Sequence, residues 1–160
     1  MERFEPSKKK IYQSSNTTPL IADVGSGNGV PGLIWAISDE SLNIVLIEKN
    51  SKKIAFLNHT IGVLKLGKRV TTIWNNVNKI NTLQFDIITS RAYSDCLRFL
   101  ESTKSISKKS STWMIMTTTS RSLNLTKKAL TKLSIEINEI LSVKINNEKT
   151  NKQIIFFKNK

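Results

Sequence analysis

Apolar residues follow two patterns along this chain: short continuous runs, and repeats at helical spacing. Short apolar runs without internal alternation are typical of buried parallel strands, and they occupy residues 20–24, 43–48, 70–74, 85–89 and 112–117. Two later runs, 136–145 and 153–158, flank a polar loop and are expected to form an antiparallel hairpin.

The segments between these strands repeat their apolar residues at helical spacing. Helices are expected at 31–38, 51–66, 94–105 and 122–133. In the second helix Asn50 or Ser51 is the expected N-cap, and Gly67 the expected residue just past the C-terminus. Strand and helix therefore alternate, which predicts an α/β fold: a Rossmann-like, doubly wound, mostly parallel sheet with a C-terminal antiparallel hairpin.

Length and composition limit the organisation of the chain. Its 160 residues are expected to form a basic leader (1–18) and one domain (19–160). We expect no membrane contact, because no apolar run reaches about 18 residues. The single cysteine, Cys96, excludes an internal disulfide, fits the cytoplasm and is expected to be a small buried residue. A monomer is expected.

The charge of the chain points to a polyanionic partner. The formal net charge is +13 at pH 7, and such a balance favours nucleic acid. Lysine far outnumbers arginine, as in proteins from AT-rich genomes, so the sign of the charge is more informative than its size.

A glycine-rich turn follows the first strand directly. Gly25, Gly27 and Gly29 stand between that strand and the next helix, an arrangement typical of a nucleotide-type cofactor site. The dinucleotide spacing fails from Gly25, and from Gly27 it places Pro31 inside the phosphate turn. The acid before the turn, Asp23, suits a cationic ligand and would repel a pyrophosphate. A glycine-rich loop without a ligand, and a nicotinamide or flavin site, remain as alternatives.

Further polar residues follow the other strands. Glu48 ends the second strand, where a carboxylate can bind a ribose diol; the alternative is a surface acid beside Lys49. Asn75–Val77 follow the third strand, and Ser90 and Arg91 follow the fourth. Ligands of such sheets bind at the carboxyl ends of the strands, so these residues are expected to converge.

Three segments carry a resemblance to a known family. Asp-Val-Gly-Ser-Gly-Asn-Gly at 23–29 resembles the first motif of S-adenosylmethionine-dependent methyltransferases. The Pro-Gly-Leu that follows at 31–33, the segment 46–57 and the Ser-Arg-Ala within 85–93 are similar to the RsmG (GidB) family of guanine-N7 methyltransferases of 16S rRNA. The resemblance extends over residues 20–105.

The resemblance implies roles for particular residues. The glycine turn would surround the methionine part of S-adenosylmethionine, Glu48 would hold the ribose, and Asn76 and Val77 would lie against the adenine. Arg91 would face the RNA; its alternative is a salt bridge to an acid such as Asp95. The implied cofactor-binding set is Asp23, Gly25, Ser26, Gly27, Gly29, Glu48, Asn76 and Val77.

The implied reaction is methyl transfer to N7 of a guanine in 16S rRNA of the small ribosomal subunit. Guanine N7 carries a free lone pair, so no general base is expected. No metal is expected either, and the one histidine, His59, is expected on a helix surface.

Two departures from the family favour a second hypothesis. The family's helical N-terminal region has no counterpart before the glycine turn, and Met116-Thr117-Thr118 stands where the family has a Lys-Gly pair. The alternative is therefore a truncated, catalytically weak or inactive RNA- or ribosome-binding remnant. A nicotinamide-dependent oxidoreductase is disfavoured by Asp23.

Overall fold

The structure is a computed structural model, which describes residues 18–91, 93, 95–122, 125–143 and 152–160. All but the last residue of the expected leader lie outside this part. The strands are β1 (Leu20–Val24), β2 (Asn43–Glu48), β3 (Val70–Trp74), β4 (Phe85–Arg91), β5 (Ser107–Thr118), β6 (Ile135–Val143) and β7 (Lys152–Asn159). The helices are α1 (Gly32–Ser38), α2 (Ser51–Val63), η1 (Val77–Lys79), α3 (Cys96–Thr103), η2 (Lys104–Ile106), η3 (Thr119–Ser122) and α4 (Lys127–Lys132).

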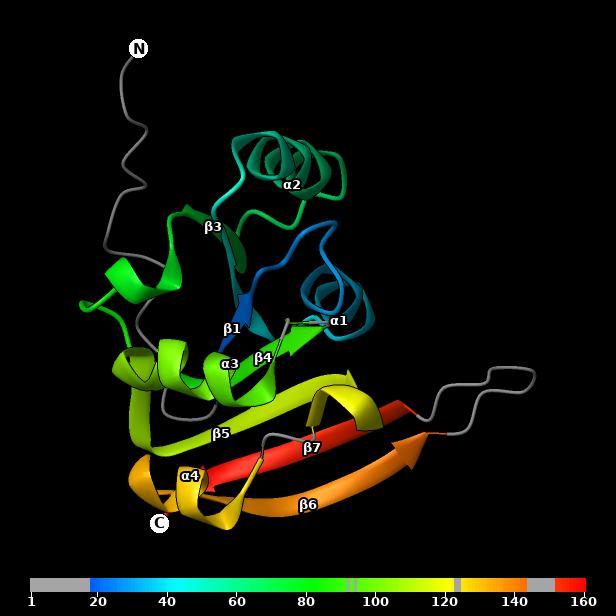
Figure 1. Cartoon of the computed structure of the whole chain (residues 1–160). Helices are drawn as coiled ribbons and strands as arrows, with labels where there is room; N and C mark the ends of the chain where they lie inside the picture. Colours follow the sequence, from blue (N-terminus) through cyan, green and yellow to red (C-terminus); the bar gives the residue numbers. More distant parts are fainter. Residues whose placement is uncertain (1–17, 92, 94, 123–124, 144–151) are drawn as a thin grey trace.

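The strands form one seven-stranded sheet in the order β3-β2-β1-β4-β5-β7-β6 (Figure 1). The first five are parallel, whereas β7 runs antiparallel to both β5 and β6. The predicted doubly wound sheet with a closing hairpin is therefore confirmed. The order reverses between β1 and β4, which makes the carboxyl ends of these strands the expected ligand site.

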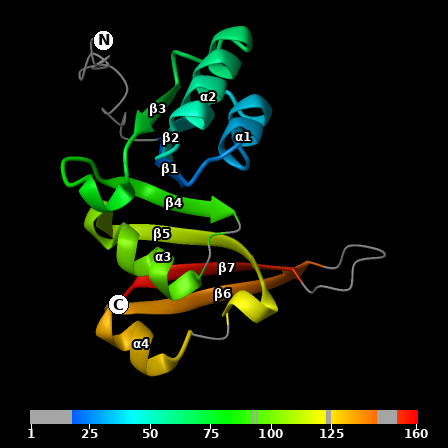
Figure 2. The same ribbon diagram turned by 45° about the horizontal axis from the view of Figure 1, so that its top comes forward.

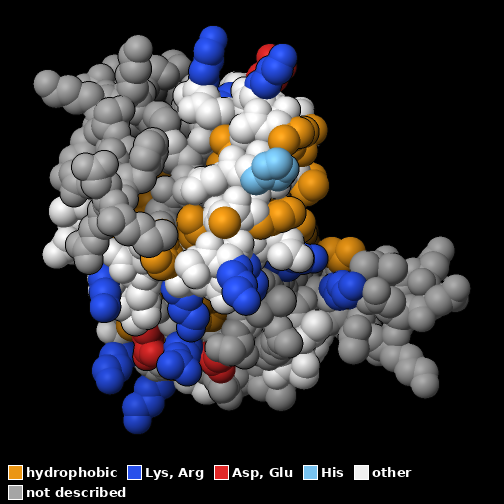
Figure 3. All heavy atoms as spheres, turned by 90° about the horizontal axis from the view of Figure 1, so that it is seen from above, with side chains coloured by type: hydrophobic (Ala, Val, Ile, Leu, Met, Phe, Trp, Pro, Cys, Tyr) orange, Lys and Arg blue, Asp and Glu red, His pale blue; other side chains and the backbone are white. Residues whose placement is uncertain are grey.

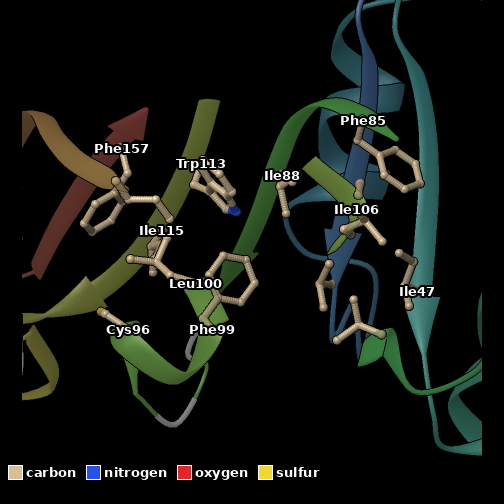
Figure 4. Close-up of a cluster of buried hydrophobic side chains, with 14 of the residues drawn as sticks. Ile47, Phe85, Ile88, Cys96, Phe99, Leu100, Ile106, Trp113, Ile115 and Phe157 are labelled. Atoms are coloured by element: carbon tan, nitrogen blue, oxygen red, sulfur yellow. The ribbon is translucent and has the colours of Figure 1, made fainter. Parts of the chain in front are cut away.

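Helices lie on both faces of the sheet. In Figures 1 and 2, α1 and α2 lie beside β1, β2 and β3, whereas α3 and α4 cover the other face over β4 to β6. Because alternate strand residues point to opposite faces, β2 supplies Val45 and Ile47 to the core under α3, and Ile44 and Leu46 to the core under α1 and α2. Trp113 is the largest side chain of the α3 core, fully buried against Phe99 and Leu100 in the cluster of Figure 4.

Several element boundaries differ from the expected ones. The segment of β5 before the apolar run is polar, yet it pairs with β4 from Ser107 across an irregularity between Phe85 and Ile87. Ser111 makes this possible, because its hydroxyl donates to the Phe85 carbonyl and accepts from the amide of Lys108. The fourth helix is shorter than expected, since α4 begins only after its N-cap, Thr126.

The expected end of α2 at Gly67 is wrong. The helix ends at Val63, and the left-handed residue beyond it is Lys65, with φ of 56°. The N-cap is Asn50, whose side chain accepts from the amides of Lys52 and Lys53. Gly67 is not among the positive-φ glycines of the described chain.

The side chains expected to be structural are placed as predicted. Cys96 is buried at the start of α3, and His59 is exposed on α2. Figure 3 shows the histidine at the surface among hydrophobic side chains of this helix layer. In the part of the chain that the structure describes, no helix has the length and apolar character needed to cross a membrane.

Candidate functional site

A polar cavity of about 680 Å³ lies at the carboxyl ends of β1, β2 and β3. Its size is within the usual range of small-molecule sites. The residues that line it come from the ends of β1 and β2, from α2, from η1 and the loop before it, and from α3 and the segment before it: Val24, Gly25, Ile47, Glu48, Lys49, Lys53, Asn75, Asn76, Val77, Asn78, Tyr93, Arg98, Glu101 and Ser102.

The glycine turn reaches this cavity at Gly25, which is part of the lining. Gly25, Gly27 and Gly29 have φ of 72°, 56° and 83°, a region that side chains disfavour. The amides of Gly25 and Ser26 both donate to the carbonyl of Ile47, which fixes the turn on β2. Gly29 has a second constraint, since a Cβ there would lie 2.3 Å from Cδ1 of Leu33. The turn therefore requires these glycines, and the member of the turn that lines the cavity is Gly25.

Glu48 connects the glycine turn to the loop after β2. Its Oε2 accepts from the amide of Gly27 at 3.0 Å, and its Oε1 accepts from the amides of Lys49 and Asn50, both at 2.9 Å. The residue is only 6 % exposed, yet it lines the cavity. A carboxylate offers about four acceptor positions, so Oε2 retains one for a ligand hydroxyl.

Asp23 lies behind the glycine turn and outside the cavity lining. It is fully buried, and its Oδ2 accepts from the amide of Gly32 at 2.9 Å. Its Oδ1 is a buried oxygen with no hydrogen-bond partner among the described residues. Burial raises the pKa of Asp23 to about 7, although the Gly32 amide and the charge of Arg91 lower it. Its direct contact with a cationic ligand stays a prediction.

The cavity floor is apolar beside these polar groups. Val24, Ile47 and Val77 lie on it and are almost completely buried. Asn76 caps the short helix η1 by accepting from the amide of Asn78, and this fixes Val77 at the end of β3. A flat aromatic ring fits such a floor, because apolar atoms lie below it and amides lie at its edge.

One side of the cavity, formed by α3 and Tyr93, was not predicted from the sequence. Arg98, Glu101 and Ser102 lie one turn apart on α3 and line the cavity with Tyr93. The Tyr93 ring meets the Phe99 ring edge-on at 5.1 Å, and its hydroxyl lies 3.3 Å from Ser102 Oγ. Arg98, Glu101 and Ser102 follow the i, i+3, i+4 spacing of a single helix face, which is the signal that relates them.

Lysine is also present in the cavity. Lys49 and Lys53 line it beside Glu48, and Lys53 Nζ lies 3.8 Å from the position of a Cβ built on Gly27. A cation therefore lies next to the glycine turn, where the sequence predicted only the acid Asp23.

Arg91 lies at the end of β4, as expected, and outside the cavity lining. The residue is exposed. It pairs in register with Met116 of β5 and lies two residues after Thr89, which pairs with Asp23. Its side chain is therefore on the sheet face of Asp23. The contact between Arg91 and RNA stays a prediction.

A second cavity, of about 460 Å³, lies on the α1 side of the sheet. Its lining is mainly apolar and includes Trp35, Ile87, Met114 and Phe156. It contains neither the glycine turn nor any strand-end residue of the predicted site, so the polar cavity is the candidate site.

Comparisons with known sequences agree with this geometry. The family model described as "GidB: rRNA small subunit methyltransferase G" matches residues 7–155. Ribosomal RNA small subunit methyltransferase G of Chromohalobacter salexigens is 37% identical over 99 residues, covering 61% of this chain and 47% of that protein. The protein of the same name from Aliarcobacter butzleri is 41% identical over 93 residues, covering 58% and 47%. The chain thus spans about half the length of these curated relatives.

Solved structures share the fold at low sequence identity. Ribosomal protein L11 methylase of Lactobacillus delbrueckii subsp. bulgaricus has a TM-score of 0.70 at 14% identity, covering 94% of this chain and 75% of that one. TYW2 of M. jannaschii, in complex with AdoMet, has a TM-score of 0.68 at 18% identity, covering 95% and 74%. The glycine turn, the strand-end carboxylate and the match over 7–155 lead to one conclusion: this chain belongs to the GidB family, that of the rRNA small subunit methyltransferase G.

Proposed function

We propose that this domain transfers a methyl group from S-adenosylmethionine to N7 of a guanine in 16S rRNA of the small ribosomal subunit. The observation that carries the proposal is the convergence of Gly25, Glu48 and Val77 on one polar cavity at the carboxyl ends of β1, β2 and β3. Family membership supports the reaction class, and the AdoMet complex of a protein with this fold supports the cofactor.

The residues present fit this cofactor. The remaining acceptor position on Glu48 Oε2 suits a ribose hydroxyl, and the apolar floor at Ile47 and Val77 suits the purine. The absence of a side chain at Gly25 suits the methionine part, and Lys53 beside Gly27 suits its carboxylate.

The chemistry asks mainly for positioning. When bound, S-adenosylmethionine would supply an electrophilic methyl group on a cationic sulfur, and the lone pair of N7 would be the group that accepts it. No proton leaves N7 before attack, so the protein need only hold the base and the methyl group in line. Gly25 and Glu48 fix one partner, and the α3 wall faces the other.

The partner in this proposal is RNA. A formal net charge of +13 favours a polyanion, and Lys49, Lys53 and Arg98 bring cations to the cavity itself. We further propose that the protein acts as a monomer in the cytoplasm.

The test uses the protein as given, labelled S-adenosylmethionine, and small ribosomal subunits from a strain that lacks the modification. We expect label in 16S rRNA as N7-methylguanine. The Glu48→Ala variant should lose transfer, whereas Glu40→Ala, which changes an exposed acid outside the cavity, should retain it. Cofactor binding without transfer to any RNA would favour the binding-remnant hypothesis, and no cofactor binding would refute the proposal.

A further inference from the structure

Arg98 and Glu101 stand one helical turn apart on α3 and both line the cavity. Within the described part of the chain, neither side chain has a hydrogen bond or an ion pair to the other or to a third residue. Opposite charges at this spacing commonly pair on a helix surface. Here both face a cavity without pairing, which leaves each available to a ligand.

Glu101 differs from the other acids near the site. Both oxygens of Glu48 already accept from backbone amides, and Asp23 is buried away from the cavity. Of the carboxylates that line the cavity, Glu101 is thus the one with both oxygens open to a ligand. Because it is exposed on α3, it keeps its charge accessible at the cavity wall.

A free carboxylate presents two acceptors in one plane. Among the four bases, guanine alone has two adjacent donors on its pairing edge, N1–H and the 2-amino group. Enzymes that act on a single base read this edge after the base leaves its stack, and they hold the base against an aromatic ring. Tyr93 supplies such a ring beside Gly25, in a position that Phe99 and Ser102 fix.

We propose that the α3 wall is the base-recognition side of the site, with Glu101 accepting from N1–H and the 2-amino group of the target guanine. Arg98, one turn earlier, binds the phosphate of the same nucleotide. This inference rests on the proposed function, and it makes Glu101 a specificity-determining residue. Edge recognition leaves N7 unengaged and free to face the glycine turn.

The test measures nucleotide binding, separately from methyl transfer. The protein is saturated with S-adenosylhomocysteine and titrated by calorimetry with guanosine monophosphate and with inosine monophosphate, which lacks only the 2-amino group. We expect the wild type to prefer the guanine nucleotide by about tenfold, the value of one well-placed base contact. Glu101→Ala should abolish that preference, and the matched control Glu40→Ala should retain it.

Three outcomes overturn the inference: no measurable guanine preference in the wild type at millimolar nucleotide, an unchanged preference in Glu101→Ala, or a loss of S-adenosylhomocysteine affinity in that variant, which would assign Glu101 to the cofactor. Arg98→Ala should weaken both nucleotides equally, since each has the same phosphate. Failure of the methyl-transfer assay alongside an intact guanine preference would refute the proposed function and leave base recognition standing.

Discussion

Gly32, the first residue of α1, lies against β1 and β2 so closely that no side chain fits. A Cβ there would be 2.4 Å from Leu46 Cδ2 and 2.8 Å from Asp23 Oδ2. We expect Gly32→Ala to lower the free energy of unfolding by about 1–3 kcal/mol through overpacking. Denaturant unfolding would measure it.

Gly62 provides the matched control for this substitution. It lies on α2, and nothing lies within 4 Å of a Cβ built on it. Gly62→Ala should leave stability unchanged or raise it by up to about 1 kcal/mol, because alanine favours a helix. Equal effects at both positions would contradict the steric argument.

Asp23 should make stability depend on pH. Burial raises its pKa from 3.8 to about 7, so between these values the folded chain holds a proton that the unfolded chain has lost. The contribution of this group to stability is thus present below about pH 4 and lost as the pH rises to about 7. The asparagine of Asp23→Asn cannot ionise, so the unfolding free energy of this variant relative to wild type should rise across this pH range. A shift of about three pKa units corresponds to a rise of a few kcal/mol.

Unfolding by denaturant at pH 4 to 8 would check this prediction. Asp39 serves as the control, because hydrogen bonds from Ser41 lower the pKa of its exposed carboxyl. Asp39→Asn should show no rise in relative stability with pH. A flat Asp23→Asn difference would mean that the buried carboxyl ionises as readily as an exposed one.

The residues of the site were partly predictable. Sequence spacing related Gly25, Glu48 and Val77, and the structure brings all three to one cavity. The spacing could not show that Asp23 is buried behind the turn, because its environment depends on α1 packing across β1. The position of Arg91 was open to prediction, since alternation along β4 places it on the face of Thr89.

At the scale of elements, α3 is joined to β5 through one buried hydrogen bond. The indole Nε1 of Trp113 donates to Thr103 Oγ1 at 2.9 Å, and Thr103 donates to the Phe99 carbonyl. Trp113 and Thr103 are both fully buried. We expect Thr103→Val to cost about 1–3 kcal/mol of unfolding free energy, since it leaves the indole N–H without a partner.

Thr60→Val is the control for the helix bond alone. Thr60 donates to the carbonyl four residues earlier on α2, and among the described residues its hydroxyl has no second hydrogen-bond partner. Its substitution should change the unfolding free energy by less than about 0.5 kcal/mol. A large effect at Thr60 would assign the cost to the helix rather than to Trp113.

The positions of the strands could be predicted from the hydrophobic pattern wherever a strand is buried in the core. The apolar runs of β1 and β2 lie at their predicted residues, because burial on both faces leaves one consistent assignment. The edge strand β3 also lies at its predicted residues, although it is only partly buried. The longer β5 was not predictable from hydrophobicity, since its polar start is held by Ser111 and by pairing with β4. Likewise, Lys65 ends α2 in a conformation that glycine usually takes.

For the whole molecule, the charge should determine how RNA binding responds to salt. Each phosphate contact contributes about 0.7–0.9 to the slope of log affinity against log salt. The double variant Lys49→Gln/Lys53→Gln removes two cations at the cavity. We expect the slope for small-subunit RNA to fall by about 1.5, which corresponds to two lost phosphate contacts. Filter binding at several salt concentrations would measure it.

A second pair of lysines separates local from general charge. Lys68 and Lys109 are exposed near the starts of β3 and β5, at the sheet end opposite the cavity. Their double Gln variant has the same net charge as the first pair but should retain the wild-type slope. Equal loss in both double variants would mean that RNA contacts the protein without preference for the site.

The architecture as a whole was predictable, whereas the α3 wall was not. Alternating strands and helices, with right-handed crossovers, leave few arrangements of a parallel sheet. Which face of α3 meets the cavity depends on how that helix sits against β5 and η1, and Arg98 and Glu101 taken singly resemble any solvated helix residues. Only the three-dimensional structure shows that both residues line the cavity.

The Glu48 carboxylate has a further consequence through its bond to Gly27. This bond joins the glycine turn to the end of β2 before any ligand binds, so the conformational entropy of the turn is lost during folding and not on binding. Ligand binding should then need little rearrangement of the main chain, and the turn should select ligands by its fixed shape.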